Sequence, residues 1–445
     1  MSLRTLAIAL SVAGLATVSQ RALALTPEEQ TARCEHIRDV AADNGIATGY
    51  LLAGIASAET NLSHCWSELD WACQGPDSPD CGGPVVAGAG DGPCSLQQGG
   101  LGMFQFDGGT FEETLARDGE GVLLLDGNVT RGVDFVVNML IGSQYVDGVS
   151  NAAEAKAWMN QVTVDGPLWD AWIKTVTHYY NGCTPTGCSA YAQRYQHYSD
   201  NGSDVYYAEE AGFWDVTLPP CASVPVDGRV LEETDTCFTK GGPLPYWRVG
   251  IGGENNLHVW TGTTAADDAV NFVEWQLGFD EPGSYLLELS LVGGTSKQAV
   301  YVVDHAGTSE AVVVDQAAAN GYVELGTFAF DANDSVQRVY LADNTGEEGG
   351  ERIVADALRV TRVDGQGPLP GADPNGNGNS GGSSEGGSNA GDDGDGDGDD
   401  DSCRAAAGPG RSGASFLLSI GLFGLVYRRA RAAREHAYKK AQRRV

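Results

Sequence analysis

The segment LLAGIASAETNL, residues 51–62, decides the fold of the first half of this chain. At 100° per residue, its leucines, Ile55 and Ala58 fall on one arc, which predicts a helix with that face in a core. Glu59 falls inside the same arc. A carboxylate on an apolar face is costly unless it is paired or functional, and desolvation there raises its pKa, as a general acid requires. A Glu at the rim of the apolar stripe, or one that is satisfied by a buried partner, explains this pattern equally well.

Two further motifs follow along the chain. The motif GMFQ, residues 102–105, places a turn permitted by glycine before an apolar pair and one amide. A Gln amide both donates and accepts hydrogen bonds, which suits a sugar amide or hydroxyl. The motif YNG, residues 180–182, combines an aromatic ring that can stack on a sugar face with a polar group that can orient it. Taken singly, a buried turn and an ordinary helix stop also explain them.

In this order, the three motifs resemble those of the lysozyme-like lytic transglycosylases, over roughly residues 41–198. That family shows Glu-Ser at the end of an apolar helix, then Gly-Leu-Met-Gln, then Ala-Tyr-Asn-Ala-Gly. This chain departs from the pattern at Thr60, which replaces Ser, and at Phe104, which replaces Met. Its Cys-rich insert between the first two motifs, residues 66–100, is also longer than usual. These departures concern substrate preference more than chemistry.

The resemblance implies an exported enzyme that cleaves the bond between N-acetylmuramic acid and N-acetylglucosamine in peptidoglycan. Glu59 is the implied single catalytic residue. It would protonate the leaving oxygen and then, as carboxylate, take the proton of the sugar's 6-hydroxyl, giving an anhydro product. Phe104, Gln105, Tyr180 and Asn181 are the implied substrate-binding residues. The reaction needs neither a metal nor another cofactor.

Two alternatives remain open for the helical half. One is a non-catalytic surface protein whose lysozyme-like domain only binds glycan. The other is a lysozyme- or chitinase-type hydrolase on the same fold, which ordinarily uses two carboxylates. Asp70, Asp91 and Asp107 are candidates for the second carboxylate, but no pattern surrounds them in their loops.

Charge and cysteine content restrict the partners and the compartment. The chain has 445 residues and a formal net charge of −33, which repels nucleic acid phosphates, so we exclude nucleic acid as a partner.

Residues 1–24 are typical of a signal peptide, with an apolar run before an A-x-A cleavage site. In an oxidising compartment the ten cysteines favour disulfides, and Cys183 and Cys188 can close a small loop. Neither His nor Cys shows metal-ligand spacing, so we expect no metal site.

The region after Arg229 predicts an all-β sandwich, because short strand-like runs alternate with turn residues. The clearest runs are Asn271–Phe279, Ser284–Val292, Gln298–Val303, Ala311–Val314, Tyr322–Phe330 and Val336–Leu341. The residues of this region resemble those of the golvesin-type carbohydrate-binding modules found beside cell-wall enzymes. The resemblance rests on Phe238, Trp247, Trp260, Asn271, Glu274-Trp275, Pro282–Tyr285, Val313–Gln316, Leu325-Gly326 and Val354–Ala357. Trp260 and Trp275 are candidate sugar platforms, although Trp in a sandwich is more often core. We expect a targeting module that is separate from the active site.

The C-terminal part has two biased segments. Residues 365–402 are rich in Gly, Asn, Ser and Asp, which predicts a disordered acidic linker. Its acidic run matches the first half of a calcium-binding loop, but Arg404 stands at the last ligand position, which favours a solvated linker. The tail that follows contains a predicted short hydrophobic helix at residues 414–427 and then an Arg cluster. Together with Cys403 it resembles the sorting tails of myxobacterial surface proteins; a simple membrane anchor is the alternative.

The sequence therefore predicts a multidomain chain with glycan strands of peptidoglycan as its partner. We expect export, with the tail attaching the protein to the membrane or the cell surface, at the outer membrane or in the periplasm; extracellular release is the alternative. The predicted parts are a signal peptide (1–24), a mainly α lysozyme-like domain (25–210), a connector (211–227), a β-sandwich (228–364), a linker (365–402) and a tail (403–445).

Overall fold

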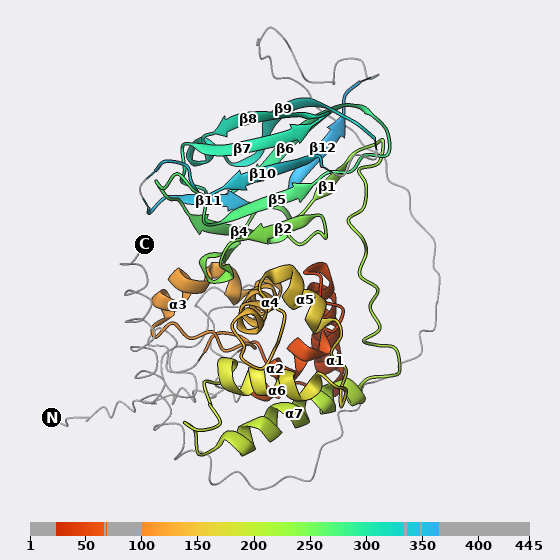
Figure 1. Ribbon diagram of the computed structural model, residues 1–445, viewed down its shortest axis with the longest axis vertical. Helices are drawn as coiled ribbons and strands as arrows, with labels where there is room; N and C mark the ends of the chain where they lie inside the picture. The colour runs from red at the N-terminus through yellow and green to blue at the C-terminus, as the bar shows by residue number, and fades with distance from the viewer. Residues whose placement is uncertain (1–23, 66–67, 69–99, 333–335, 348, 365–445) are drawn as a thin grey trace, which may run out of the picture.

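The computed structural model describes residues 24–65, 68, 100–332, 336–347 and 349–364. Within these residues a helical part precedes a β-sandwich, and Figure 1 shows the sandwich resting on the helices. The predicted signal peptide up to residue 23, most of the Cys-rich insert, the linker and the tail lie outside the described residues. Among the described residues, no helix has both the length and the apolar character needed to span a membrane.

The helical part begins with two helices that the sequence pattern dictates. A capping box at Thr26 starts the first helix, and the second helix has buried residues on most of its surface. The predicted helix at residues 51–62 is confirmed; it ends at Thr60 because Asn61 adopts a left-handed conformation with φ 52°. The α-helices of this part are α1 (Pro27–Asp43), α2 (Tyr50–Thr60), α3 (Phe111–Asp118), α4 (Leu125–Ile141), α5 (Ala152–Met159), α6 (Trp169–Thr175) and α7 (Tyr191–Ala208).

The β part consists of antiparallel sheets with the strand orders β1-β12-β6-β9, β2-β5-β10-β7-β8 and β11-β4-β3. The six runs that the sequence predicted correspond to β5 through β10, which confirms them. Trp260 and Trp275 are 7% and 1% exposed, so both are core residues and neither offers a sugar platform. The strands are β1 (Arg229–Leu231), β2 (Phe238–Gly241), β3 (Arg248–Ile251), β4 (Leu257–Gly262), β5 (Phe272–Gln276), β6 (Gly283–Leu291), β7 (Ala299–His305), β8 (Thr308–Val314), β9 (Gly321–Phe330), β10 (Arg338–Ala342), β11 (Arg352–Ala355) and β12 (Leu358–Arg362).

Buried charged groups join the two parts. Arg131 of α4 binds Asp118 through Nε and Nη2 at 3.1 and 3.0 Å, and its Nη1 donates to the Trp247 carbonyl at 2.8 Å. Lys240 of β2 forms an ion pair with Asp134 of α4 at 2.7 Å, with both side chains at most 9% exposed. The sandwich is thus packed against α4, in addition to being linked through the connector.

Apolar contacts complete this interface. Leu124, at the start of α4, packs with Val249 and Leu257 of the sandwich in a small buried cluster. The backbone approaches closely here, because a Cβ on Gly119 would lie 2.0 Å from the Val249 carbonyl oxygen. This contact could not be predicted from the sequence, because its residues are not adjacent in the chain.

Disulfides constrain both parts. Cys183 and Cys188 are bonded, which confirms the predicted small loop. A second disulfide joins Cys221 of the connector to Cys237 just before β2. Cys65 also takes part in a disulfide. These bonds fit an extracellular protein.

Candidate functional site

Glu59 lies in the last turn of α2, where α7 crosses closely. A Cβ on Gly54 of α2 would lie 2.7 Å from the Cα of Gly202 in α7, so the two helices can approach this closely only because both residues lack side chains there. Further along the same contact, the Tyr198 hydroxyl donates a hydrogen bond to Glu59 Oε1. The glycine contact therefore sets the helix spacing that brings Tyr198 to the carboxylate.

The electrostatic environment of Glu59 favours its protonated form. The side chain is half-buried, and burial raises its pKa above the ordinary value. The hydrogen bond from Tyr198 and the nearby charges of His197 and Arg194 act in the opposite direction, because each stabilises the carboxylate. A carboxyl held in this balance can give up a proton and then exist as a stabilised anion.

The predicted residues Tyr180 and Asn181 lie beside this pair. A π-helical turn, Val176–Tyr180, follows α6 and ends at Asn181; such turns are frequent at functional sites. Burial and the nearby Glu59 carboxylate raise the pKa of Tyr198 well above its usual value, and Tyr180 adds to this rise. A hydrogen bond with the Asn181 side chain lowers the pKa of Tyr198. Three of the residues predicted from sequence thus surround one tyrosine hydroxyl.

Asn181 has a polar atom available for a ligand. Its Oδ1 is buried and has no hydrogen-bond partner within the described residues. A buried amide oxygen without a partner is costly, and a donor on a bound molecule would remove that cost. The Asn181 side chain also hydrogen-bonds Tyr198, so this acceptor lies near the pair of Glu59 and Tyr198.

Gln105 and Phe104 have local structural contacts. The Gln105 amide donates to the carbonyls of Gly102 and Gly100 at 2.9 and 3.2 Å and accepts from the Gly100 amide at 3.2 Å, so it closes its own turn. The Phe104 ring is 1% exposed and packs against Gly132 of α4, so it is part of the core. A role of Phe104 in binding substrate stays a prediction. The Phe104 carbonyl accepts from the Tyr180 hydroxyl and so positions that ring.

The sequence interpretation missed Tyr198, together with its helix neighbours Arg194 and His197. The spacing of Arg194 and Tyr198 places them one turn apart on α7. However, α7 is rich in tyrosine, and nothing in its local pattern distinguishes Tyr198 from the others. Of the candidate second carboxylates, only Asp107 is described; its Oδ1 accepts from the Gly109 amide at 2.8 Å, within its own turn.

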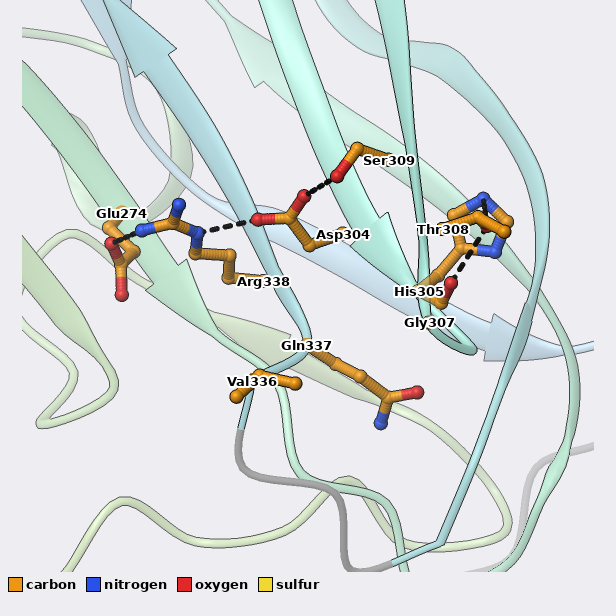
Figure 2. Close-up of a pocket in the computed structure, with 9 residues that line it drawn as sticks. All are labelled: Glu274, Asp304, His305, Gly307, Thr308, Ser309, Val336, Gln337 and Arg338. Carbon is orange, nitrogen blue, oxygen red and sulfur yellow. Dashed lines mark hydrogen bonds and ion pairs between the residues drawn. The ribbon is translucent and has the colours of Figure 1, made fainter.

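A separate polar pocket of about 480 Å³ opens on the sandwich, and Figure 2 shows its residues. Arg338 connects two carboxylates here, with Nη1 2.5 Å from Glu274 and Nε 2.7 Å from Asp304. Ser309 also donates to Asp304. Charged and polar side chains that line a pocket can orient a polar ligand. The lining residues are Glu274, Asp304, His305, Gly307, Thr308, Ser309, Val336, Gln337 and Arg338.

Carboxylates that could share a cation also lie in the sandwich. Within the described part of the chain, only Glu232, Glu233 and Asp356 form a group of three possible ligand side chains close enough to hold one ion. From the sequence we expected no metal site, because the three residues show no ligand spacing along the chain.

Known proteins are similar to part of this chain. No curated protein matches the chain. Similar solved structures include a Paenibacillus xanthan lyase (18% identity, TM-score 0.27, 31% of this chain and 13% of that one) and the C-terminal CBM6 of LamC from Zobellia galactanivorans (14%, 0.23, 30% and 99%). A family 35 carbohydrate binding module from Clostridium thermocellum is also similar (12%, 0.22, 30% and 98%). With TM-scores this low, we base no argument on these three.

The family match is more specific. Residues 250–362 match the family described as Golvesin C-terminal domain, and the match does not extend to the helical part. These residues run from the end of β3 to the end of β12. Over this range, the sandwich is therefore similar to the Golvesin C-terminal domain family, as the sequence predicted.

Proposed function

We propose that this protein binds glycan strands of peptidoglycan and cleaves them at the bond between N-acetylmuramic acid and N-acetylglucosamine. The observation that carries the proposal is the placement of Glu59, whose half-buried carboxyl has a raised pKa and is oriented by Tyr198. A raised pKa supplies the proton that the leaving oxygen needs near neutral pH. The gathering of Tyr180 and Asn181 around Tyr198 supplies groups to orient the sugar.

The proposed reaction uses one carboxyl group. Protonated Glu59 gives its proton to the glycosidic oxygen as the glycosidic bond breaks, and the leaving sugar departs as an alcohol. The Glu59 carboxylate then removes the proton from the 6-hydroxyl of the remaining sugar. The oxygen of that hydroxyl bonds to the anomeric carbon, which gives the anhydro ring and restores the acid. The Tyr198 hydroxyl stabilises the carboxylate between the two steps.

The sandwich contributes a second glycan contact in this proposal. Its polar pocket around Arg338 is the proposed contact, since the two Trp candidates are buried. A second contact raises the local concentration of the enzyme on an insoluble wall. The disulfides fit an exported chain, and the localisation at the cell surface or in the periplasm remains part of the proposal.

A second candidate is a non-catalytic glycan-binding protein. The family match favours it, because the match covers the sandwich and not the helical part that contains Glu59. A hydrolase on the same fold is a further alternative. It differs only in adding water to the product and ordinarily needs a second carboxylate.

Mass spectrometry of the products separates these candidates. Purified peptidoglycan is incubated with the protein, and the molecular masses of the soluble fragments are measured. Anhydro ends support the proposal, whereas fragments that carry one added water at the new end identify a hydrolase. If the protein cosediments with peptidoglycan but releases no fragments, the non-catalytic candidate is correct.

A further inference from the structure

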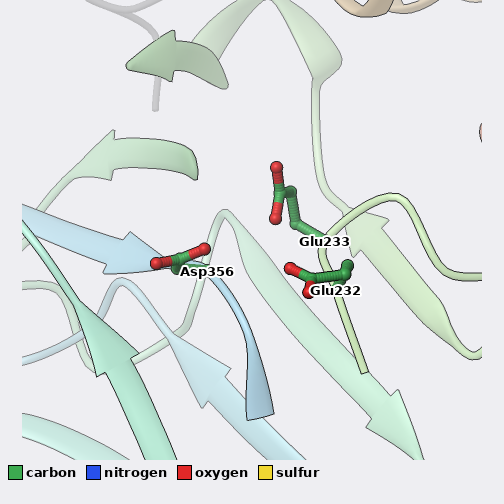
Figure 3. A group of neighbouring side chains, drawn as sticks. All are labelled: Glu232, Glu233 and Asp356. Carbon is green, nitrogen blue, oxygen red and sulfur yellow. The ribbon is translucent and has the colours of Figure 1, made fainter. Parts of the chain in front are cut away.

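Strand pairing brings three carboxylates together at one edge of the sandwich. Leu231, the last residue of β1, pairs with Leu358, the first residue of β12. Because the two strands are antiparallel, the two residues after β1 face the two residues before β12. Glu232 and Glu233 therefore come beside Asp356, and one oxygen from each of the three lies within 4.8 Å of the others (Figure 3).

Each carboxylate keeps one oxygen without a hydrogen-bond partner. Glu233 and Asp356 are 8% and 1% exposed. Glu232 Oε2, Glu233 Oε2 and Asp356 Oδ1 are buried, and none has a partner among the described residues. A buried carboxylate oxygen without a donor or a cation is strongly unfavourable, so three of them in one cluster point to a common ligand.

Asp356 is fixed by its other oxygen. Its Oδ2 accepts hydrogen bonds from Ser290 Oγ at 2.6 Å and from the Glu254 amide at 3.0 Å. Gly253 makes room for this carboxylate, because a Cβ there would lie 2.1 Å from Oδ2. Gly253 also has a φ of +95°, which favours glycine. One oxygen is thus held in place, and Oδ1 is left to face Glu232 and Glu233.

Among the residues that the structure describes, no cation pairs with the cluster. Burial and the neighbouring carboxylates raise the pKa of Glu232 and of Asp356 to about 7, and burial and Asp356 raise that of Glu233 well above its usual value. In the described residues, no ion pair includes any of the three. Lys240 acts on Glu233 at a distance, but its ammonium binds Asp134.

We propose that Glu232, Glu233 and Asp356 bind one calcium ion. Carboxylate oxygens are the ligands of hard cations, and the cluster contains no nitrogen or sulfur ligand. Calcium accepts six to eight oxygens, including bidentate carboxylates and waters, whereas magnesium demands stricter octahedral geometry. The ion ties the first strand of the sandwich to the connection between its last two strands. The proposal is independent of the chemistry at Glu59.

Calcium titration and thermal unfolding of the exported chain test the site. After removal of metals with EDTA, we expect a binding event with a Kd on the order of 10⁻⁴–10⁻³ M, as in extracellular modules. At 10 mM calcium, Tm should rise by about 4–8 °C. Asp356→Asn and Glu233→Gln should each abolish the rise. The proposal is wrong if calcium leaves the Tm of the natural chain unchanged, or if both variants keep the full rise.

Two controls distinguish the site from other causes. A triple variant of the acidic linker, with Asn at Asp393, Asp395 and Asp397, should retain the rise in Tm; losing it there would assign the effect to the linker. In EDTA, Asp356→Asn should fold with a Tm equal to or above that of the natural chain at pH 8, because it removes one of three repelling carboxylates. A lower Tm in EDTA would contradict the repulsion on which the argument depends.

Discussion

Replacing Glu59 with Gln removes one ionisable proton and changes little else. Gln has the same shape, and its amide oxygen can accept the hydrogen bond that Tyr198 now gives to Oε1. The neighbouring contact between α2 and α7, from His197 Nε2 to the Ala58 carbonyl at 2.9 Å, involves backbone and is retained. We therefore expect Glu59→Gln to fold and to bind glycan while it loses cleavage.

The size of the loss follows from the role of the carboxyl. Removal of a general acid typically lowers the rate by about 10²–10⁴-fold, which corresponds to about 2.7–5.4 kcal/mol of transition-state stabilisation. Here the same residue also acts as the base of the second step, so the upper end of that range applies. Binding to peptidoglycan should change less than about threefold, because the variant retains the acceptor for Tyr198.

The Gln substitution lowers activity, but at high pH it should increase stability relative to the natural chain. Because burial raises the pKa of Glu59 above its ordinary value of 4.5, the folded state prefers the neutral carboxyl. The natural chain has the resulting stabilisation in full below pH 4.5 and loses it as the pH rises through the raised pKa. The Gln variant does not titrate. The free energy of unfolding of the variant, minus that of the natural chain, should therefore be larger at pH 8 than at pH 4.

Release of soluble muropeptides and cosedimentation with peptidoglycan measure activity and binding, and urea unfolding at pH 4 and pH 8 measures stability. Glu112→Gln, at an exposed position of α3, is the matched control and should retain full activity. Cleavage by a folded Glu59→Gln variant within tenfold of the natural rate would refute the assignment. A variant that loses stability between pH 4 and pH 8, relative to the natural chain, would refute the linkage argument.

Three further substitutions test contacts of the helical part. Tyr198→Phe removes a hydrogen bond that lowers the pKa of Glu59, so the alkaline limb of the pH–rate profile should move to higher pH; an unmoved limb contradicts this. Lys240→Met leaves the Asp134 carboxylate buried and unpaired, which should cost about 3–5 kcal/mol in urea unfolding, and adding Asp134→Asn should recover most of it. Gly102→Ala should cost about 1–3 kcal/mol, measured as a lower Tm, because φ is +63° and a Cβ there would lie 2.3 Å from a neighbouring amide.

Several elements could be predicted from the sequence because their signals are local. The periodicity of residues 51–62 predicted α2 and placed Glu59 on its apolar face. Alternating apolar residues and turn residues predicted β5 through β10 to within a few residues. The bond between Cys183 and Cys188 required only a short separation in an oxidising compartment. In each case, neighbouring residues in the chain supply the interaction that the pattern predicts.

The partners of these elements depended on tertiary structure. Tyr198 is 139 residues from Glu59, and only the close crossing of α2 and α7 brings its hydroxyl to the carboxylate. The same holds for Lys240 and Asp134, which are 106 residues apart and meet because the sandwich packs on α4. Gln105 had the expected chemistry, but its amide bonds to the backbone of its own turn.

The carboxylate cluster is the clearest example of a site that depends on tertiary structure. The acidic character of Glu232, Glu233 and Asp356 is a property of the sequence, but the strands beside them, β1 and β12, were not among the predicted runs. The sequence contains no spacing that joins the three residues, and for that reason we expected no metal site. The antiparallel register of β1 and β12 decides that they meet. A register is fixed by backbone hydrogen bonds between distant strands and by which faces are buried, and both exist only once the chain has folded.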